Sequence, residues 1–122
     1  MSTTDGPLAG KTVIDLTTAL AGPYATLLLA SLGARVIKVE NPTRGGDSSR
    51  NNSPYVTADG LQMRRTGPDD MSVSMMARGR GKESVTLNLK HPESRAVFFD
   101  LVRQADIVVE NYSAGVTRRL GI

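Results

Sequence analysis

A glycine turn between a short apolar run and a helical pattern is the first feature of the sequence that suggests chemistry. Gly22 and Pro23 follow the β-branched run Thr12–Leu16. A strand that ends before such a turn directs the free amides of the next helix toward an anionic phosphate. Glu40 closes the following apolar run, near the place where dinucleotide-binding folds hold a carboxylate for a ribose hydroxyl. The spacing favours NAD, but the three-glycine pattern is incomplete, and a glycine that only closes a strand–helix corner explains the turn equally well.

Basic side chains near predicted strand ends form a second group of residues that could bind a ligand. A guanidinium binds two phosphate oxygens at once through its planar donors, and a lysine adds a point charge. Each of these residues, taken singly, is most simply a solvated surface side chain, but the set favours an anionic ligand. The six cations are Arg78, Arg80, Lys82, Lys90, Arg118 and Arg119.

The remaining reactive residue types argue against several classes of site. His91 is the single histidine, there is no cysteine, and no carboxylate pair stands at ligand spacing, so neither a metal site nor a catalytic triad is expected. We expect His91 to cap the helix that Pro92 begins. Asp15 and Asp106 lie in or beside predicted strands. Either could act as a nucleophile by residue type, but structural hydrogen bonds are the better interpretation for each. The sequence contains no G-x-S-x-G nucleophile elbow.

Composition limits the class of protein. The 122 residues suit one domain, and only 4% are aromatic, so the core should be mainly aliphatic. The net charge of +3 is spread without a basic block, which argues against nucleic-acid binding. The lack of cysteine excludes disulfides and thiolate chemistry, and it favours a cytoplasmic location. We expect no signal peptide and no membrane span, because no apolar run is long enough to cross a bilayer.

The elements that must position these groups begin with a strand, a helix and a second strand. The run Thr12–Leu16 predicts the first strand, a helix opens at Gly22, and the alternating residues of Arg35–Glu40 predict the second strand. Gly33 stands where the end of the helix requires a left-handed conformation. The apolar residues at helical spacing are Tyr24, Leu27 and Leu28, followed by Ser31. The pattern is typical of a βαβ unit.

The second half of the chain continues the alternation. It predicts a strand over Ser84–Leu89, a strand over Ile107–Glu110 and a helix over Val116–Leu120. The helix that Pro92 begins should carry Phe98, Leu101, Val102 and Ala105 on one face. The fold class is therefore α/β: Rossmann-like, with a mostly parallel sheet and crossover helices. We expect it to be incomplete, because the chain stops before one face of the sheet is covered.

A long stretch between the two halves breaks the pattern. Residues 41 to about 77 are rich in Gly, Pro, Asn, Ser and Arg and poor in large apolar side chains. We expect a long loop that is either a lid or, the interpretation we favour, a segment ordered by contacts outside this chain.

Three blocks of sequence, in order, resemble a known family. They are "PLAGKTVIDLTTALAGPYATLLLASLGARVIKVE", "RGKESVTLNLKHPESR" and "ADIVVENYSAGVTRRLG". They resemble the amino-terminal part of the family III CoA-transferases, the CaiB/BaiF group, and they span nearly the whole chain except the stretch from 41 to 77. The resemblance implies that residues 1–122 form the amino-terminal CoA-binding part of a larger domain, with coenzyme A as the ligand in place of a dinucleotide.

The resemblance also implies which positions contact coenzyme A. The residues that match Leu20 and Ala21 line the thiol end, and Asn41 matches a position that approaches the nucleotide. Lys90 and Arg119 match the phosphate partners. The full set of matching positions is Leu20, Ala21, Asn41, Leu87, Asn88, Leu89, Lys90, Asn111, Tyr112, Ser113 and Arg119. Transferases for formyl-CoA and oxalate carry Gln at the position of Leu20 and a basic residue at that of Asn41, so this substrate pair is not expected.

The family's chemistry, as the resemblance implies it, uses an aspartate that attacks the thioester and then carries CoA as an enzyme thioester. The matching position lies beyond Ile122, so no catalytic residue is expected in this chain, which alone should be inactive. The substrates would be an acyl-CoA and a carboxylic acid. The resemblance also implies an intertwined homodimer as the assembly of the full-length protein. A complementing chain is the alternative partner.

Two other functions remain compatible with the sequence. The 2-methylacyl-CoA racemases share this opening and replace acyl transfer by proton abstraction beside the thioester. A truncated relative that binds CoA or a partner subunit without chemistry is the other alternative. The sequence does not identify the acyl group or the acceptor acid.

Overall fold

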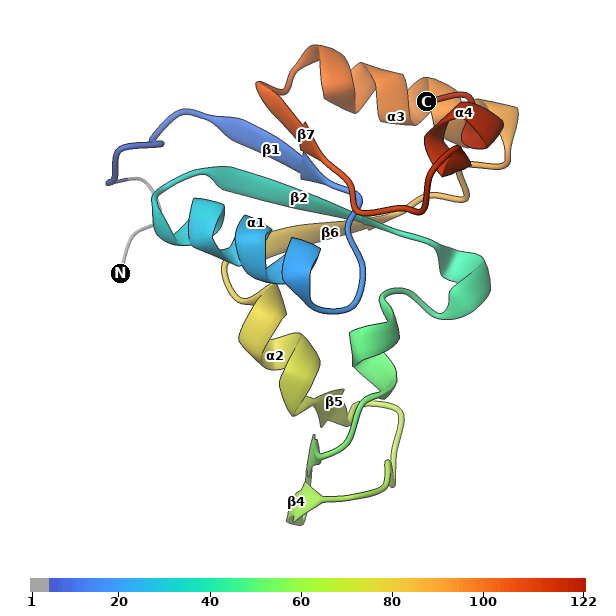
Figure 1. The fold of residues 1–122 in the computed structure, drawn as a ribbon. Helices are drawn as coiled ribbons and strands as arrows, with labels where there is room; N and C mark the ends of the chain where they lie inside the picture. The colour runs from blue at the N-terminus through green and yellow to red at the C-terminus, as the bar shows by residue number, and fades with distance from the viewer. Residues whose placement is uncertain (1–4) are drawn as a thin grey trace.

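The computed structural model describes residues 5–122, and its main feature is a four-stranded sheet in which every pairing is parallel. The strand order is β6-β2-β1-β7, so the first two strands lie side by side at the centre (Figure 1). The strands are β1 (Thr12–Asp15), β2 (Arg35–Glu40), β6 (Lys82–Thr86) and β7 (Ile107–Val109). The predicted α/β class with a parallel sheet is confirmed.

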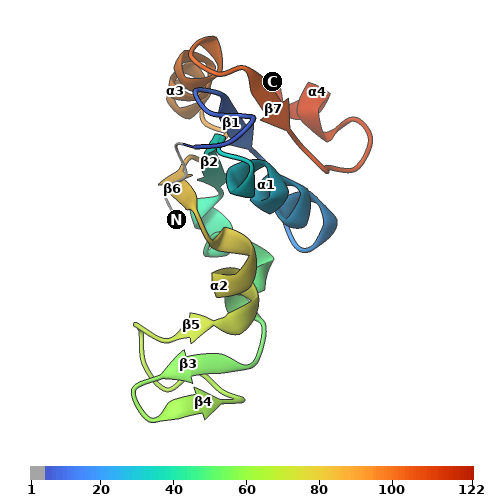
Figure 2. The ribbon, with the colours of Figure 1, turned by 90° about the vertical axis from the view of Figure 1, so that its left-hand side faces the viewer.

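Helices cover the two faces of this sheet. Helix α1 (Ala21–Ser31) follows β1 and packs over one face, where Ala30 joins Val13 and Val36 in a buried cluster. Helix α3 (Pro92–Arg103) packs over the other face through Phe98. Figures 1 and 2 show the two helices on opposite sides of the strands.

Strand β2 differs from the alternating strand that its sequence predicts. Its five residues from Val36 to Glu40 are all buried. The reason is its place between β1 and β6, with α1 on one side and α3 on the other, because a parallel strand inside a covered sheet has no solvent face. The polar members Lys38 and Glu40 are consequently buried charges.

The buried face of α1 also differs from the helical spacing noted in the sequence. Its buried residues are Gly22, Pro23, Thr26, Leu27 and Ala30, whereas Tyr24 and Leu28 are about half exposed. The inward residues are mostly small because the helix lies close to the β1 strand end, where Thr26 donates to Asp15 at 2.6 Å. Gly33 ends the helix region with φ of +100°, as predicted.

The second half agrees closely with the expected pattern. Phe98 of α3 is buried in a core cluster, and Leu101, Val102 and Ala105 pack against that cluster. Helix α4 (Val116–Leu120) forms as predicted, and β7 stops one residue before the expected Glu110. Strand β6 begins earlier than expected, because Lys82 and Glu83 already pair with Val36 and Ile37 of β2. It also ends earlier, because Asn88 starts a turn in which the His91 amide donates to the Asn88 carbonyl at 2.8 Å.

The stretch predicted as a long loop is divided into short elements. They are η1 (Pro42–Arg44), η2 (Ser48–Asn51), β3 (Tyr55–Thr57), β4 (Gly60–Gln62), β5 (Met71–Ser72) and α2 (Val73–Gly79). The three strands form an antiparallel sheet of order β4-β3-β5, which projects from the main body beyond α2 (Figure 2). Tyr55 and Met75 are buried there, so a few apolar side chains give this segment its own contacts.

Among residues 5–122, no helix combines the length and the apolar character that a membrane crossing requires.

Candidate functional site

A pocket of about 360 Å³ lies at the carboxyl edge of the parallel sheet. Residues just beyond all four strand ends contribute to it. The strand order reverses beside β1, with β2 on one side and β7 on the other, and open parallel sheets leave a crevice at such a reversal. The lining residues are Leu16, Thr17, Thr18, Lys38, Val39, Glu40, Asn41, Arg44, Gly46, Asp47, Leu87, Asn88, Leu89, Lys90, Asn111, Tyr112, Ser113, Val116 and Leu120.

Eight of the eleven predicted binding positions line this pocket. They come from three strand ends and are Asn41, Leu87, Asn88, Leu89, Lys90, Asn111, Tyr112 and Ser113. Leu20 and Ala21 are exposed at the start of α1 and lie outside the lining. Arg119 is exposed on α4 and also lies outside it, although Val116 and Leu120 of the same helix belong to it.

No residue of the first turn of α1 lines this pocket, so the predicted phosphate cradle is not part of it. A Cβ atom on Gly22 would lie 2.4 Å from Thr17 Cβ and 3.0 Å from Asn111 Nδ2, so protein atoms already fill the space beside this turn. Asn111 fastens the turn by accepting from the Thr18 amide at 3.0 Å and donating to the Thr18 carbonyl at 2.9 Å. Gly22 is therefore needed for a close approach of chain segments.

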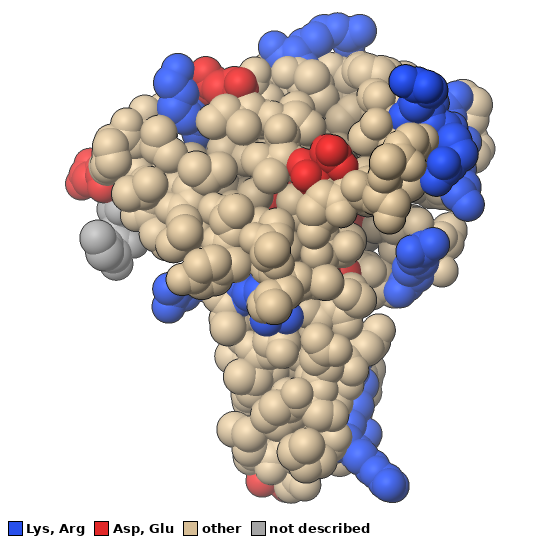
Figure 3. All heavy atoms as spheres, in the orientation of Figure 1, with Lys and Arg blue, Asp and Glu red and all other residues tan. Residues whose placement is uncertain are grey.

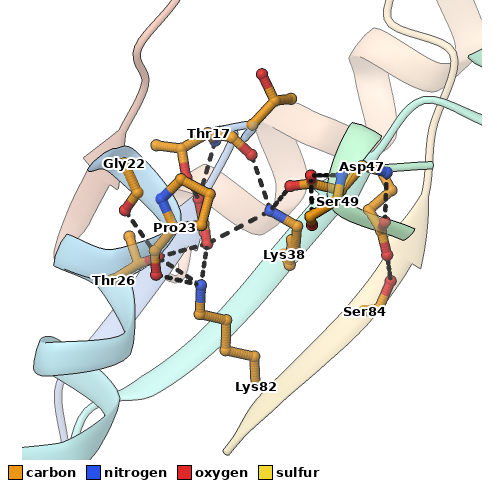
Figure 4. A network of polar contacts seen from close by, with 12 residues as sticks. Thr17, Gly22, Pro23, Thr26, Lys38, Asp47, Ser49, Lys82 and Ser84 are labelled. Carbon is orange, nitrogen blue, oxygen red and sulfur yellow. Dashed lines mark hydrogen bonds and ion pairs between the residues drawn. The ribbon is translucent and has the colours of Figure 1, made fainter. Parts of the chain in front are cut away.

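A buried charge network lies under the pocket (Figure 4). Asp15 at the end of β1 is fully buried, and its Oδ2 lies 3.0 Å from Lys82 Nζ. Burial by itself raises the pKa of the Asp15 carboxyl. Hydrogen bonds from Thr17 and Thr26, together with the Lys38 and Lys82 charges, outweigh burial and hold that pKa below its usual value. The structural role expected for Asp15 is confirmed.

The second half of the network joins β2 to the turn that follows it. Lys38 Nζ lies 2.7 Å from Asp47 Oδ2 and donates to the Thr17 carbonyl at 2.8 Å. Asp47 Oδ1 accepts from the Ser49 amide at 2.8 Å and from the Ala19 amide at 3.3 Å. These contacts tie the β1–α1 loop and the turn after β2 to one buried ammonium group.

Glu40 is engaged with protein partners, which contradicts a role in holding a ribose. Its carboxylate accepts two hydrogen bonds from Arg50, at 2.8 and 2.7 Å, and others from Ser84 and the Asp47 amide. Burial raises the pKa of Glu40, but these partners outweigh it and lower the pKa to about 2. The end of β2 therefore carries a structural ion pair where spacing alone favoured a dinucleotide contact.

Of the six cations singled out in the sequence, Lys90 lines the pocket. Lys82 belongs to the buried network, with its side chain 2% exposed. Arg78, Arg80, Arg118 and Arg119 lie outside the lining. Sequence reasoning missed Arg44, Thr17 and Thr18, although each follows a predicted strand end, which is the signal that identified their neighbours.

Two further sequence expectations concern hydrogen bonds at element ends. His91 occupies the N-cap position of α3, but its side chain makes no capping hydrogen bond. Asp106 accepts from the Thr12 amide at 2.9 Å and pairs with Lys11 at 2.9 Å, as expected of a structural carboxylate. Among the described residues, no cluster of three His, Asp or Glu side chains is arranged to hold a metal ion.

The pocket surface combines an apolar wall with a cationic rim. Leu16, Val39 and Leu89 belong to a buried core cluster and also line the pocket, together with Leu87, which packs against that cluster. The two carboxylates in the lining, Glu40 and Asp47, are both neutralised by cations. In Figure 3, Lys and Arg side chains gather at the right-hand edge, beside α4 and the turn after β2. Such a surface suits an anionic ligand with a partly apolar body.

Comparisons with known proteins agree on one family. The family model for CoA-transferase family III matches residues 8–122. Over 116 residues the chain is 45% identical to acetyl-CoA:oxalate CoA-transferase of Acetobacter aceti, covering 95% of this chain and 26% of that protein. Over 114 residues it is 46% identical to succinyl-CoA:mesaconate CoA-transferase of Haloarcula marismortui, covering 93% and 26%.

Solved structures show the same similarity. A CAIB/BAIF family protein from Brucella suis superposes with a TM-score of 0.81 at 34% identity, over 97% of this chain and 29% of that one. A hypothetical protein (Rv3272) from Mycobacterium tuberculosis gives a TM-score of 0.78 at 32% identity, with the same coverage. The chain thus spans less than a third of the length of the relatives it matches.

Proposed function

Because this chain belongs to CoA-transferase family III, we propose that its pocket binds coenzyme A and that the chain forms the CoA-binding part of a CoA-transferase. The observation that carries the proposal is the convergence of eight predicted contact positions on one pocket from separate strand ends. Such a convergence is not a property of the local sequence, since it depends on the strand order.

The pocket's chemistry fits the parts of coenzyme A. The leucine wall offers apolar contact to the pantetheine chain or to the face of adenine, and Lys90 offers an exposed cation to a phosphate. Asn88 and Ser113 add polar groups at the same edge. A few polar groups on a mostly apolar surface are what fixes the orientation of a small ligand.

We further propose that the nucleophile is a carboxylate outside these 122 residues. The two carboxylates that line the pocket are held by cations at 2.7 Å, and Glu40 and Asp47 therefore serve the structure. In the proposed reaction, a carboxylate oxygen bonds to the acyl carbon of the thioester and CoA leaves as the thiolate. The thiolate then attacks the resulting anhydride at the enzyme's carbonyl carbon, which frees the first acid and leaves CoA on the enzyme. An acceptor carboxylic acid takes CoA in the reverse sequence.

The relatives favour a transferase over the racemase alternative. The proteins from Acetobacter aceti and Haloarcula marismortui are both named CoA-transferases, and no feature of the described residues favours proton abstraction. Their names specify different acids, oxalate and mesaconate, so the proposal is limited to the classes acyl-CoA and carboxylic acid. A cytoplasmic location stays a prediction from the sequence.

Assembly with further chain is part of the proposal. A Chloroflexus aurantiacus relative, 37% identical over 121 residues, is named a beta subunit. The outer side of α1 exposes an apolar row, Leu20, Tyr24, Leu28 and Leu32, each at least 44% exposed. We propose that a second copy of the family chain, as in an intertwined homodimer, covers such surfaces.

Calorimetric titration of the 122-residue chain with coenzyme A tests the proposal. We expect saturable binding that weakens in Lys90→Gln and persists in Lys11→Gln, whose lysine is paired with Asp106 away from the pocket. Incubation with an acyl-CoA and free acids should give no exchange of CoA. Absence of binding by the folded chain would contradict the proposed site, and turnover by the chain alone would contradict the external nucleophile.

A further inference from the structure

The turn after β2 presents an arginine to the pocket that no comparison assigns a role. Arg44 is the last residue of η1, is exposed, and lines the pocket. Within residues 5–122 it forms no ion pair, whereas nearby Arg50 is paired with Glu40. An exposed guanidinium without a carboxylate partner keeps all of its donors for a ligand.

The neighbouring Asn41 has a different task in this turn. Its Oδ1 accepts from the Thr43 amide at 2.9 Å and from Thr43 Oγ1 at 2.8 Å. It thereby caps η1, and its amide oxygen is occupied by the protein. An asparagine is moreover neutral, so the position expected to approach the nucleotide supplies no charge. The cation at this strand end is Arg44, one turn later.

The backbone that carries Arg44 is held at both ends. The Gly46 amide donates to the Asn41 carbonyl at 3.1 Å, and the Asp47 amide donates to Glu40 at 2.8 Å. The Asp47 side chain is itself anchored by the buried Lys38. A short turn fixed to buried ion pairs positions a guanidinium with little loss of backbone entropy on binding.

Arg44 and Tyr112 line the same pocket from different strand ends, Arg44 from the turn after β2 and Tyr112 from the segment after β7. Burial raises the pKa of the Tyr112 hydroxyl, Glu110 and Asp15 add to that rise, and the Arg44 charge opposes it. Because β2 and β7 lie on either side of β1, the pocket brings the Arg44 charge near a group from the other side of the central strand. Lys90 lies on the same rim, after β6, and it too forms no ion pair within the described part of the chain.

Two unpaired cations on an exposed rim above an apolar wall match the nucleotide end of coenzyme A. That end carries a pyrophosphate and a ribose 3′-phosphate, and the 3′-phosphate is a terminal monoester with a charge near −2 at neutral pH. A terminal dianion reaches a solvent-exposed rim more readily than the internal pyrophosphate. Resting on the proposed binding of coenzyme A, we propose that Arg44 binds the ribose 3′-phosphate and makes the chain discriminate coenzyme A from dephospho-CoA.

The test is calorimetric titration of the 122-residue chain and its Arg44→Gln variant with coenzyme A and with dephospho-CoA, which lacks only the 3′-phosphate. We expect the unaltered chain to prefer coenzyme A by at least about tenfold, the typical effect of one charge-assisted contact. Arg44→Gln should remove most of this preference by weakening coenzyme A binding, with little change for dephospho-CoA. Arg44→Lys should keep part of it.

The matched control is Arg103→Gln, which removes one exposed arginine on α3, outside the pocket lining. It should leave both affinities unchanged. Circular dichroism and urea unfolding should find Arg44→Gln as stable as the unaltered chain, because the Arg44 guanidinium forms no ion pair within the described part of the chain.

The outcomes separate this inference from the function on which it rests. Failure of the unaltered chain to bind coenzyme A overturns the proposed function. Binding without discrimination between the two ligands, or discrimination that survives Arg44→Gln, overturns the role of Arg44 alone. An equal loss for both ligands places Arg44 at the pyrophosphate and overturns its assignment to the 3′-phosphate.

Discussion

Single buried charges decide how the pocket edge is built. Lys38 is 2% exposed and lies between Asp47, at 2.7 Å, and Asp15, at 3.9 Å. A buried ion is tolerated only when partners replace its hydration, so each member of this group depends on the others. The same residues that appear suited to catalysis by type are therefore committed to holding loops.

Replacing Lys38 by Met should strongly destabilise the fold. The substitution keeps much of the side-chain volume but leaves Asp47 buried without its ammonium partner, and breaking such a pair costs about 3–5 kcal/mol. Lys11→Met is the control, because its pair with Asp106 is exposed and worth less than about 1 kcal/mol. Urea unfolding measures both. Equal losses for the two variants would show that burial does not set the effect.

Glu40 makes stability fall in acid. Its pKa drops from 4.5 to about 2 on folding, so its contribution is fully present above pH 4.5 and is lost as the pH falls toward 2. At 1.36 kcal/mol per pKa unit, the contribution is roughly 3 kcal/mol. The pKa values of Asp15 and Asp47 are also lowered on folding, so these two carboxylates contribute to the same loss of stability in acid.

In urea unfolding at pH 6 and pH 3, Glu40→Gln should lose less stability on acidification than the unaltered chain. A parallel decline would assign the acid sensitivity to the other carboxylates.

Among the elements, the turn after β2 connects the core to the pocket. Gly45 and Gly46 have φ of +68° and +87°, the left-handed region in which a side chain is strained. The space around them differs. A Cβ on Gly46 would lie 2.7 Å from Glu40 Oε1 and 2.9 Å from Arg50 Nε, whereas a Cβ on Gly45 would meet no atom within 4 Å.

Gly46→Ala should therefore be more destabilising than Gly45→Ala. Both variants bear a backbone cost of about 1–2 kcal/mol for the left-handed conformation. Gly46→Ala must also displace the Glu40–Arg50 ion pair, so we expect a further loss of about 1–3 kcal/mol. The comparison by urea unfolding isolates the contact from the strain. Indistinguishable stabilities would mean that the ion pair moves aside without cost.

For the whole molecule, the exposed apolar row on α1 is the surface that we propose a second copy of the chain covers. Leu20, Tyr24, Leu28 and Leu32 recur at intervals of four residues, which places them on one side of the helix. Light scattering should detect association of the chain that increases with concentration, and Leu28→Glu should reduce it. Because Leu28 is 48% exposed, Leu28→Glu should change the free energy of unfolding by only about 0.5 kcal/mol.

Ala25→Glu provides the control for this association, since Ala25 is exposed on the same helix but lies outside the row. It introduces the same charge and should leave association unchanged. A chain that stays monomeric at all concentrations, or an equal effect of both substitutions, would exclude the row as a contact surface.

Several features of the fold and site were predictable from local sequence. The period of apolar residues predicted β2 and α4 to the residue, and Gly33 marked the end of α1, because backbone conformation responds to near neighbours. The stretch from 41 to 77 was not predictable as short elements, since its strands are only two or three residues long and are held by contacts among themselves. Tyr55 and Met75 become core residues only once those elements meet.

The sequence by itself determined the order and type of the main elements and the family to which the chain belongs. Local patterns of residue type are sufficient to identify each of these. The tertiary structure decided which of the polar residues are free. Asp15 and Lys82 stand 67 positions apart yet form one buried pair, and Glu40 is occupied by Arg50. Arg44 and Lys90 line one pocket only because β2 and β6 lie side by side and end at the same edge. Burial and pairing depend on how strands are ordered in space, and that order decides whether a charge holds the protein together or remains available to a ligand.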